Sequence, residues 1–317
     1  MDPSSEIILG TPMFRIYKDL HVDRLVGTDT VPAGFDAATA VASKDVAIGG
    51  DAGFSVRLYL PNRTANQTDG QTKKRLRVLI YFHGGGFVAE SAASPTYHGF
   101  LNSLAARAGM LVVSVNYRLA PEHPLPVAYE DSLRALEWAV SAGNDPWLSE
   151  HGDLGRVFLV GDSAGGNIVH NVAMMAASSA DVAARIEGAV LLHAMFWGRE
   201  PIAGESLEAA EMIDRLWSIV CPEATGGLDD PRLNPMAAAA PSLRGMPCRM
   251  LLVCESDGDF FRPRVRAYYE AVVASGWGGE VEWFESMGKD HVFFLSELGC
   301  HQAVALMDRL VSFFAGN

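Results

Sequence analysis

From residue 77 onward, the chain alternates short apolar runs with longer segments in which apolar residues recur at helical spacing. The apolar runs are typical of strands buried on both faces, and they cover residues 77–82, 110–116, 156–161, 186–193, 249–255 and 280–285. The amphipathic segments, several of which begin near Asp or Ser, cover residues 96–108, 128–143, 164–178, 263–275 and 301–315. Strands that alternate with helices predict an α/β fold with a mainly parallel sheet covered on both faces.

The first part of the chain alternates apolar and polar residues with a period of two, which predicts antiparallel strands. Residues 14–17 and 22–25 flank the polar sequence KDLH and predict an early hairpin. A connection rich in Gly, Ala and Asp follows to about residue 42. The sequence VAIGGDAGFSVRLYLP, residues 46–61, predicts a second strand-turn-strand unit. The polar run at 62–75 predicts a surface loop.

The strand and helix alternation is interrupted between residues 193 and 249, which are more than 50 residues apart. This interval contains a segment of helical spacing at 206–220 and a Gly-, Asp-, Pro- and Ala-rich tail at 226–241. An excursion of this kind from an α/β sheet is more often a lid or cap than a second domain. We therefore expect it to cover one end of the sheet.

Composition narrows the choice of partner and compartment. The 25 basic and 38 acidic side chains give a formal charge of −13, which disfavours binding to nucleic acid or to an anionic membrane. No stretch is long and apolar enough to span a bilayer. The amino terminus carries two acids in its first six residues and has no long apolar run, so we expect a cytoplasmic protein, with a nuclear location also open. The four cysteines lack CxxC spacing and predict reduced thiols rather than disulfides or a metal site.

The sequence GDSAG at 161–165 lies between the apolar run ending at 161 and a helical segment. In that context GxSxG is typical of a nucleophile elbow, a sharp strand-to-helix turn that exposes a serine, here Ser163. A glycine-rich turn or a phosphate-binding loop is the alternative for such a sequence.

A serine hydroxyl needs a base to remove its proton and an acid to orient that base. After an elbow, these partners follow in the order acid, histidine. Four histidines follow Ser163, and His291 is the candidate base because it lies in a loop directly after a strand, at the edge where the elbow opens. His170 and His301 lie in helical segments, and His193 ends a strand, where a satisfied core histidine is expected.

The acid is expected in the loop after the strand at 249–255. Glu255 still belongs to that strand, whereas Asp257 and Asp259 both lie in the loop. Either aspartate can also cap the helix that follows. Position alone leaves Asp257 and Asp259 as alternatives.

The sequence HGGGF at 83–87 follows the first apolar strand. Acyl transfer places negative charge on a carbonyl oxygen, and backbone N–H groups of a glycine-rich loop can bind that oxyanion. A dinucleotide-binding loop is the rival interpretation. It is disfavoured because the sequence lacks GxGxxG spacing and has no acidic residue at the end of a second strand.

These motifs together resemble a known family. HGGGF at 83–87, NYRLAPEHPLPVAYED at 116–131, GDSAGGNI at 161–168 and GKDHVFF at 288–294 are similar to the plant carboxylesterases of the hormone-sensitive-lipase group, which have the α/β-hydrolase fold. The resemblance implies a single domain over residues 1–317 with a mostly parallel, eight-stranded sheet. It also implies a cap formed by about residues 1–42 and 197–240.

The resemblance assigns roles to particular residues. The nucleophile falls on Ser163 and the base on His291. The acid falls on Asp259, because the family pattern of an acid, two apolar residues and an arginine matches residues 259–262. Oxyanion donors fall on Gly84, Gly85 and Ala164, while Gly86 is expected to serve the turn. The NYRLAPEHPLP segment is expected to be structural.

The implied activity is hydrolysis of a small-molecule ester by a serine carboxylesterase that needs no organic cofactor and no metal. The resemblance also covers dehydratases of isoflavonoid synthesis and tuliposide-converting enzymes, which perform elimination and intramolecular ester exchange. Gibberellin receptors are similar as well, but they have lost the catalytic histidine, and here His291 is present. No oligomeric state is predicted.

Pocket walls are expected mainly from the cap, whose aromatic and sulfur-containing side chains suit a flat or apolar group of the substrate. The same side chains can equally form the core of the cap. The candidates are Phe87, Asp162, Met195, Phe196, Trp197, Met212 and Trp217.

Overall fold

A computed structural model describes residues 6–50, 54–62, 75–141 and 145–316. Its main sheet has the strand order β12-β11-β10-β9-β7-β8-β6-β5-β4. The strands from β12 to β8 are parallel, and β6, β5 and β4 extend the sheet in antiparallel fashion. Their bounds are β4 Phe35–Asp36, β5 Val41–Ala47, β6 Ser55–Pro61, β7 Leu76–Phe82, β8 Leu111–Asn116, β9 Gly152–Asp162, β10 Ile186–Leu192, β11 Met250–Ser256 and β12 Glu280–Ser286.

The sheet confirms the α/β class and the mainly parallel pairing, with one difference in strand number. The resemblance implied eight strands, whereas the described residues form nine. The additional strand, β4, is a two-residue pairing against the start of β5, too short to leave a periodic signal in the sequence. The strands predicted from apolar runs are all present, although β9 begins at Gly152, four residues before the prediction.

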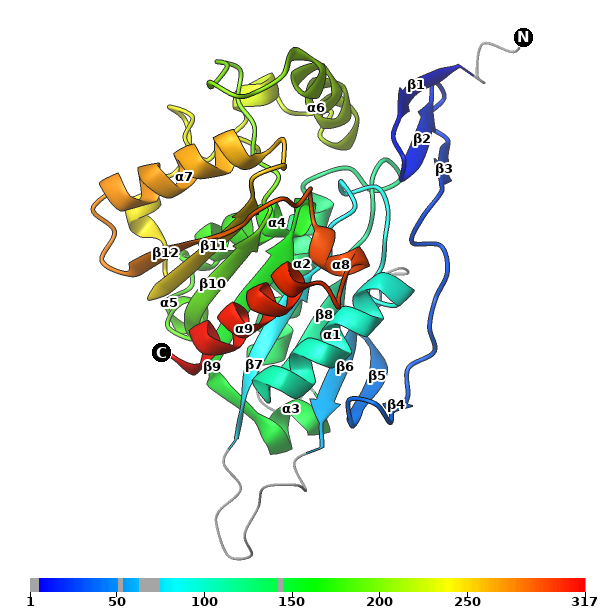
Figure 1. Ribbon diagram of the computed structural model, residues 1–317, viewed down its shortest axis with the longest axis vertical. Helices are drawn as coiled ribbons and strands as arrows, with labels where there is room; N and C mark the ends of the chain where they lie inside the picture. Colours follow the sequence, from blue (N-terminus) through cyan, green and yellow to red (C-terminus); the bar gives the residue numbers. More distant parts are fainter. Residues whose placement is uncertain (1–5, 51–53, 63–74, 142–144, 317) are drawn as a thin grey trace, which may run out of the picture.

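Helices cover both faces of the sheet (Figure 1). Alternate residues of β7 show the division, because Val78 and Ile80 face the core under α2, α4 and α7, whereas Leu79 and Tyr81 face the core under α1 and α9. The helix bounds are α1 Pro95–Ala108, α2 Val127–Val140, α3 Pro146–His151, α4 Ala164–Ala176, α5 Ala180–Ala183, α6 Leu207–Val220, α7 Arg262–Ala274, α8 Phe293–Ser296 and α9 His301–Ala315.

Every predicted long helix is found within a few residues, while α3, α5 and α8 were not predicted because four to six residues do not establish a helical period. The predicted loop at 62–75 lies almost entirely outside the described residues, and so do residues 51–53 of the turn predicted at 49–53. Within the described part of the chain, no helix is long and apolar enough to cross a membrane.

The predicted early hairpin is part of a small antiparallel sheet, formed by β1 Ile7–Gly10, β2 Phe14–Tyr17 and β3 Val22–Arg24. Arg24 fastens this sheet to the main body. Its Nε donates to the carbonyl of Val88 at 2.6 Å, and its guanidinium pairs with both carboxylate oxygens of Glu122 at 2.7 and 2.8 Å. Glu122 belongs to the NYRLAPEHPLP segment, so this contact supports a structural role for it.

The interval between β10 and β11 contains α6, which begins at Leu207 directly after its cap residue Ser206. The helix buries Ile213, Leu216 and Trp217 along one side. Both α6 and the small sheet lie near the glycine loop after β7. A Cβ added to Gly86 would be 3.6 Å from atoms of Leu216 and of Phe14 in β2. The two segments expected to form a cap therefore approach the same loop (Figure 1).

A buried ion pair holds the start of this interval against α7. Arg264 donates to the two carboxylate oxygens of Glu205 at 2.7 and 2.8 Å, and both side chains are at most 5% exposed. The guanidinium also donates to the carbonyl of Glu200 at 2.9 Å. A buried pair of this kind leaves an uncompensated charge if one partner is removed.

We predict that Arg264→Gln lowers the free energy of unfolding by about 3 to 5 kcal/mol, because Glu205 would remain buried without its partner. The matched control is Arg215→Gln, whose ion pair with Glu211 is exposed on both sides. Its expected cost is under about 0.5 kcal/mol. Urea unfolding measures both values, and equal losses for the two variants would contradict the prediction.

Candidate active site

Ser163 lies at the predicted turn between β9 and α4, with backbone angles φ +53° and ψ −118°. Its N–H donates to the carbonyl of Leu192 at 2.9 Å, and its carbonyl accepts the N–H of Met195 at 2.9 Å, so the end of β10 clamps the turn. Gly165 is required beside it, because a Cβ there would lie 2.0 Å from the carbonyl oxygen of Phe82. The geometry is that of a strained nucleophile elbow.

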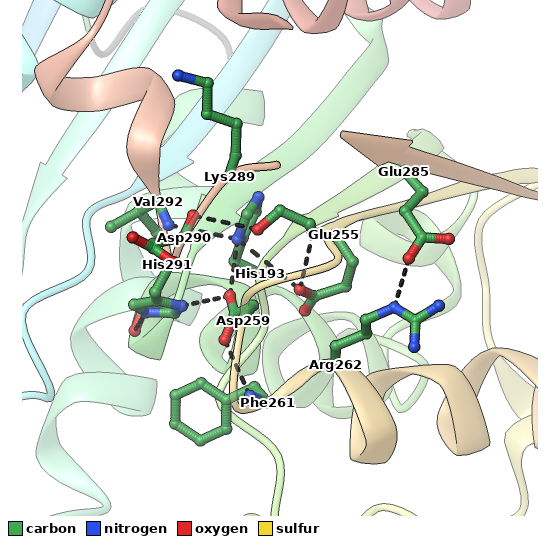
Figure 2. Close-up of polar contacts among 12 residues, drawn as sticks. His193, Glu255, Asp259, Phe261, Arg262, Glu285, Lys289, Asp290, His291 and Val292 are labelled. Carbon is green, nitrogen blue, oxygen red and sulfur yellow. Dashed lines mark hydrogen bonds and ion pairs between the residues drawn. The ribbon is translucent and has the colours of Figure 1, made fainter. Parts of the chain in front are cut away.

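The structure brings Ser163, His291 and Asp259 into one chain of hydrogen bonds. His291 Nε2 lies 2.9 Å from Ser163 Oγ, and His291 Nδ1 lies 2.6 Å from Asp259 Oδ2. Figure 2 shows the contact between His291 and Asp259. His291 comes from the loop between β12 and α8, and Asp259 from the loop between β11 and α7. Hydroxyl, imidazole and carboxylate are thus arranged as in a nucleophile, base and orienting acid.

The two aspartates that position alone left as alternatives have different partners. Asp259 contacts His291, whereas Asp257 Oδ1 accepts the N–H groups of Gly288 and Lys289 at 2.6 and 3.3 Å. Asp257 therefore holds the loop that carries His291 without touching its ring.

The environment of the pair shifts both pKa values. Burial alone would raise the pKa of Asp259, but the charge of His291 and the hydrogen bonds from His193 and His291 outweigh it and hold the pKa well below its usual range. Burial would lower the pKa of His291, yet the charge and hydrogen bond of Asp259, aided by Asp162, raise it above the ordinary value. Asp259 is thus a carboxylate throughout the physiological range.

The remaining histidines after Ser163 differ in their surroundings. His170 is buried, with its Nδ1 3.0 Å from the hydroxyl of Tyr268, and burial lowers its pKa to about 4. His301 is exposed at the start of α9. His193 is buried as expected of a core histidine, but its Nδ1 lies 2.7 Å from Asp259 Oδ2, a contact that the sequence analysis did not anticipate.

The glycine loop requires one correction among the expected oxyanion donors. The N–H of Gly84 donates to the hydroxyl of Tyr97 at 2.8 Å, and that hydroxyl donates to Asp162 at 2.8 Å. Gly84 is therefore not available to an oxyanion. Among the described residues, the N–H groups of Gly85, Gly86 and Ala164 donate to no acceptor. The N–H of Gly86, which was expected to serve the turn and not the oxyanion, is thus open among the described residues, whereas that of Gly84 is not.

Gly85 owes its identity to the shape of this loop. It has φ +97°, and a Cβ would lie 2.2 Å from the carbonyl oxygen of Ala89. The N–H groups of Val88 and Ala89 both donate to the carbonyl of Gly85 and close the turn. The loop thus turns sharply, and the N–H groups of Gly85 and Gly86 have no acceptor in the described part of the chain.

A cavity of about 550 Å³ lies between β1 and α6, and Ser163, Asp259 and His291 are not among the described residues that line it. Phe260 lines it, and the Phe260 ring lies 5.7 Å from the ring of His291. The other walls come from β1 and from the start and middle of α6, including Ser206, Glu208, Glu211, Met212 and Arg215. The cavity combines apolar and polar walls and lies between the two segments expected to form a cap.

Most of the expected pocket residues lie elsewhere. Of those named from the sequence, Met212 lines this cavity, and Phe260 was missed although it directly follows the acid. Asp162 is excluded as a pocket wall because its carboxylate accepts the hydroxyls of Tyr81 and Tyr97. Phe87, Met195, Phe196, Trp197 and Trp217 are buried in the main core cluster.

The core positions of these aromatic residues have specific partners. Phe196 packs on His170 and Tyr268, Trp197 packs on Phe261, and Phe87 packs on Trp217. The alternative that these side chains form a core therefore fits the structure better than a role as pocket walls.

One group of side chains in the described ranges has the spacing of metal ligands, namely Nδ1 of His193, Nδ1 of His291 and Oδ2 of Asp259, all within 4.8 Å. Both nitrogens lie at hydrogen-bond distance from the same oxygen. Two N–H donors to one carboxylate account for this arrangement.

Comparison with known proteins shows the family to which the chain belongs. A model of the α/β hydrolase fold matches residues 79–295. The chain therefore belongs to the α/β-hydrolase family, which confirms the resemblance, the fold and the expected hydrolase class.

Individual relatives cover nearly the whole chain. A chloroplastic tuliposide A-converting enzyme 2 of Tulipa gesneriana is 46% identical over 98% of this chain and 80% of its own length. Probable carboxylesterase 2 of Arabidopsis thaliana is 41% identical over 95% and 94%. A 2-hydroxyisoflavanone dehydratase of Glycyrrhiza echinata is 40% identical over 95% and 94%. Among solved structures, an esterase of Pyrobaculum calidifontis matches with a TM-score of 0.70 and 25% identity over 86% and 84%.

These relatives correct the expected location. The tulip enzyme is chloroplastic, and a second tuliposide A-converting enzyme of Tulipa gesneriana, 44% identical over 100% of this chain and 82% of its own length, is amyloplastic. Both of these relatives are plastid enzymes, and the cytoplasmic or nuclear expectation is wrong. The composition of the first residues was an unreliable guide to compartment.

The pKa directions give a test that does not depend on activity. We predict that His291 titrates above pH 6.5, whereas His83 and His170 titrate near pH 4 because burial disfavours their charged forms. The Cε1–H resonances of the histidines, followed by NMR during a pH titration and assigned with single His→Ala variants, measure all three. A His291 resonance that titrates below pH 6.5 would contradict the described contact with Asp259.

Proposed function

We propose that the protein is a serine carboxylesterase that hydrolyses small-molecule carboxylic esters through an acyl-enzyme intermediate. The observation that carries this proposal is the continuous hydrogen-bonded chain from Ser163 Oγ through His291 to Asp259, at the carboxyl ends of strands β9, β12 and β11 of the parallel sheet. The similarity to a probable carboxylesterase supports it. In this proposal the whole chain works as one domain, with α6 and the small sheet as its cap.

In the first half of the reaction, His291 Nε2 accepts the proton of Ser163 as Oγ bonds to the ester carbonyl carbon. Asp259 keeps the imidazole oriented and stabilises its positive charge. The tetrahedral intermediate then collapses, the bond to the alcohol oxygen breaks, and His291 returns the proton to that oxygen.

In the second half, water attacks the acyl-enzyme while His291 accepts one of its protons. Collapse releases the carboxylic acid and restores Ser163 with the proton from His291. Both tetrahedral intermediates carry a negative oxygen. We assign its stabilisation to the N–H groups of Gly85, Gly86 and Ala164, since these have no other acceptor among the described residues.

The cavity between β1 and α6, whose wall residue Phe260 lies against His291, indicates a substrate of mixed character. Phe260 and Met212 offer apolar walls, whereas Ser206, Glu208 and Glu211 offer hydrogen-bonding groups on the α6 side. A small ester with an apolar part near the triad and a hydroxyl-bearing part toward α6 fits these walls.

Intramolecular ester exchange is a second candidate, favoured by the tuliposide A-converting relative. The same acyl-enzyme would be attacked by a hydroxyl of the substrate instead of by water. Reaction in ¹⁸O-labelled water separates the two, because hydrolysis places one solvent oxygen in the acid product and exchange places none.

We predict that Ser163→Ala lowers kcat for a short-chain p-nitrophenyl ester by about 10⁴-fold or more, as expected for loss of a triad member. The control is a measurement of folding by circular dichroism, because this substitution removes one oxygen at the surface of the elbow. Equal rates for wild type and variant, or no turnover by the wild type, would refute the esterase proposal.

The acid assignment has its own test. Asp259→Asn should lower kcat by about 10⁴-fold, because an amide no longer fixes the productive imidazole tautomer. Asp257→Asn should lose less than about 10-fold, since its Oδ1 can still accept the two N–H groups of the His291 loop. A larger loss for Asp257→Asn would reverse the assignment.

A further inference from the structure

His193, at the end of β10, contacts the same carboxylate oxygen as His291. Its Nδ1 lies 2.7 Å from Asp259 Oδ2, and His291 Nδ1 lies 2.6 Å from that atom. Figure 2 shows the two rings meeting Asp259 from different sides. The other oxygen, Oδ1, accepts the N–H of Phe261 at 2.9 Å. The carboxylate is thus held by three N–H donors, of which two, the His193 ring and the Phe261 backbone, belong to residues outside the triad.

The contact fixes the protonation state of His193. Asp259 is ionised, so a nitrogen 2.7 Å from it must carry a proton, because two lone pairs at that distance would repel. The backbone N–H of Val292 lies 3.3 Å from the same Nδ1, too far to determine the tautomer against the carboxylate. His193 is therefore a donor through Nδ1.

We propose that His193 is a positioning residue of the active site, which fixes the carboxylate of Asp259 and shares its negative charge with His291. This inference rests on the proposed function only for its effect on turnover. The contact itself exists independently of the reaction.

Burial keeps His193 neutral. Desolvation lowers its pKa despite the hydrogen bond and charge of Asp259. Its Nε2 is also buried and has no hydrogen-bond partner among the described residues, so a second proton there would find no acceptor among them. A neutral donor adds no charge that would repel the imidazolium of His291, and its hydrogen bond persists over the working pH range.

The backbone supports a fixed position for this side chain. His193 has φ +51°, a conformation that is costly for a residue with a Cβ. Two other residues of the site also have a positive φ. Ser163, directly after β9, has φ +53°, and Val292, directly after His291, has φ +48°. The N–H of His193 donates to the carbonyl of Cys254 in β11 at 2.8 Å. The strand end that clamps Ser163 therefore also aims a donor at Asp259.

Other charged groups pack around this carboxylate. Glu255 Oε2 in β11 lies 3.7 Å from His193 Nδ1. Burial and the nearby charge of Asp259 raise the pKa of Glu255 well above its usual value, which favours its protonated form. Asp162 from β9 acts on His291, and Glu285 from β12 is paired with Arg262. Asp259 is thus the ionised carboxylate in direct contact with both rings.

Removing the His193 donor has a predictable sign. The negative charge of Asp259 would then act on His291 alone and stabilise its protonated form more strongly, which raises the pKa of His291. The acid limb of kcat/KM would move to higher pH, since a protonated His291 cannot act as base. The less firmly held carboxylate would also orient the imidazole less well.

The test compares His193→Phe and His193→Ala, which remove the donor, with His193→Asn, which retains an N–H near the position of Nδ1 and tolerates a left-handed backbone. His170→Phe is the matched control, because it replaces another buried histidine that bonds to Tyr268 and does not touch the triad. Thermal unfolding of each variant reports the purely structural cost.

For the variants without the donor, we expect kcat for a p-nitrophenyl ester to fall by about 10- to 100-fold, the range for one hydrogen bond to a charged group, with KM changed less than about threefold. The acid limb should rise by about 0.5 pH unit or more. In His193→Asn, the acid limb of kcat/KM should lie at the same pH as in the wild type. In His170→Phe, the pH of this limb should not change.

NMR titration of the His291 Cε1–H in wild type and His193→Phe separates this inference from the proposed function. An unchanged His291 pKa in folded His193→Phe and His193→Ala overturns the inference. An acid limb of kcat/KM that shifts equally in the control His170→Phe also overturns it. Failure of the wild type to hydrolyse any ester refutes the esterase proposal alone, because the titration still measures the contact.

Discussion

The carboxylate of Asp259 accepts N–H groups from His291, His193 and the backbone of Phe261 while only 4% of the residue is exposed. A buried ion without such donors would be neutralised by protonation. The three hydrogen bonds keep it ionised, and its charge in turn raises the pKa of His291 and fixes the direction of its ring. The basicity of the imidazole and its alignment with Ser163 both depend on this one group.

The sheet explains how residues so far apart in sequence meet around that carboxylate. In the order β12, β11, β10 and β9, neighbouring parallel strands lead into His291, Asp259, His193 and Ser163. Carboxyl ends of parallel strands lie at one edge, so Asp259 follows a strand that is next to those of both His291 and His193. His291 reaches Ser163 from a loop that follows a strand three positions away from β9. The glycine loop after β7 adds N–H donors from the other side of β9. The two segments expected to form a cap are fastened to the main body by Arg24 and Arg264.

Sequence patterns predicted the parallel strands of the main sheet and the long helices, because these depend on local periodicity. They also selected Ser163 and His291, which the structure brings within 2.9 Å of each other. The choice between Asp257 and Asp259 was open on position alone, since both lie in one loop and only tertiary contacts separate them. Gly84 was misassigned because the direction of its N–H is set by Tyr97, thirteen residues away. His193 was expected to be a satisfied core histidine, and its partner lies 66 residues further along the chain. For the aromatic residues named as candidate pocket walls, the sequence contained no pattern that distinguishes a pocket wall from a core position.

The most direct test of the account is covalent trapping of the nucleophile with a p-nitrophenyl dialkyl phosphate, followed by peptide mass spectrometry. The account predicts release of one equivalent of p-nitrophenol per protein and a single dialkylphosphoryl adduct on Ser163, with a trapping rate that falls as His291 becomes protonated and that collapses in His291→Ala. An adduct on another residue, or trapping that is equally fast in His291→Ala, would contradict it.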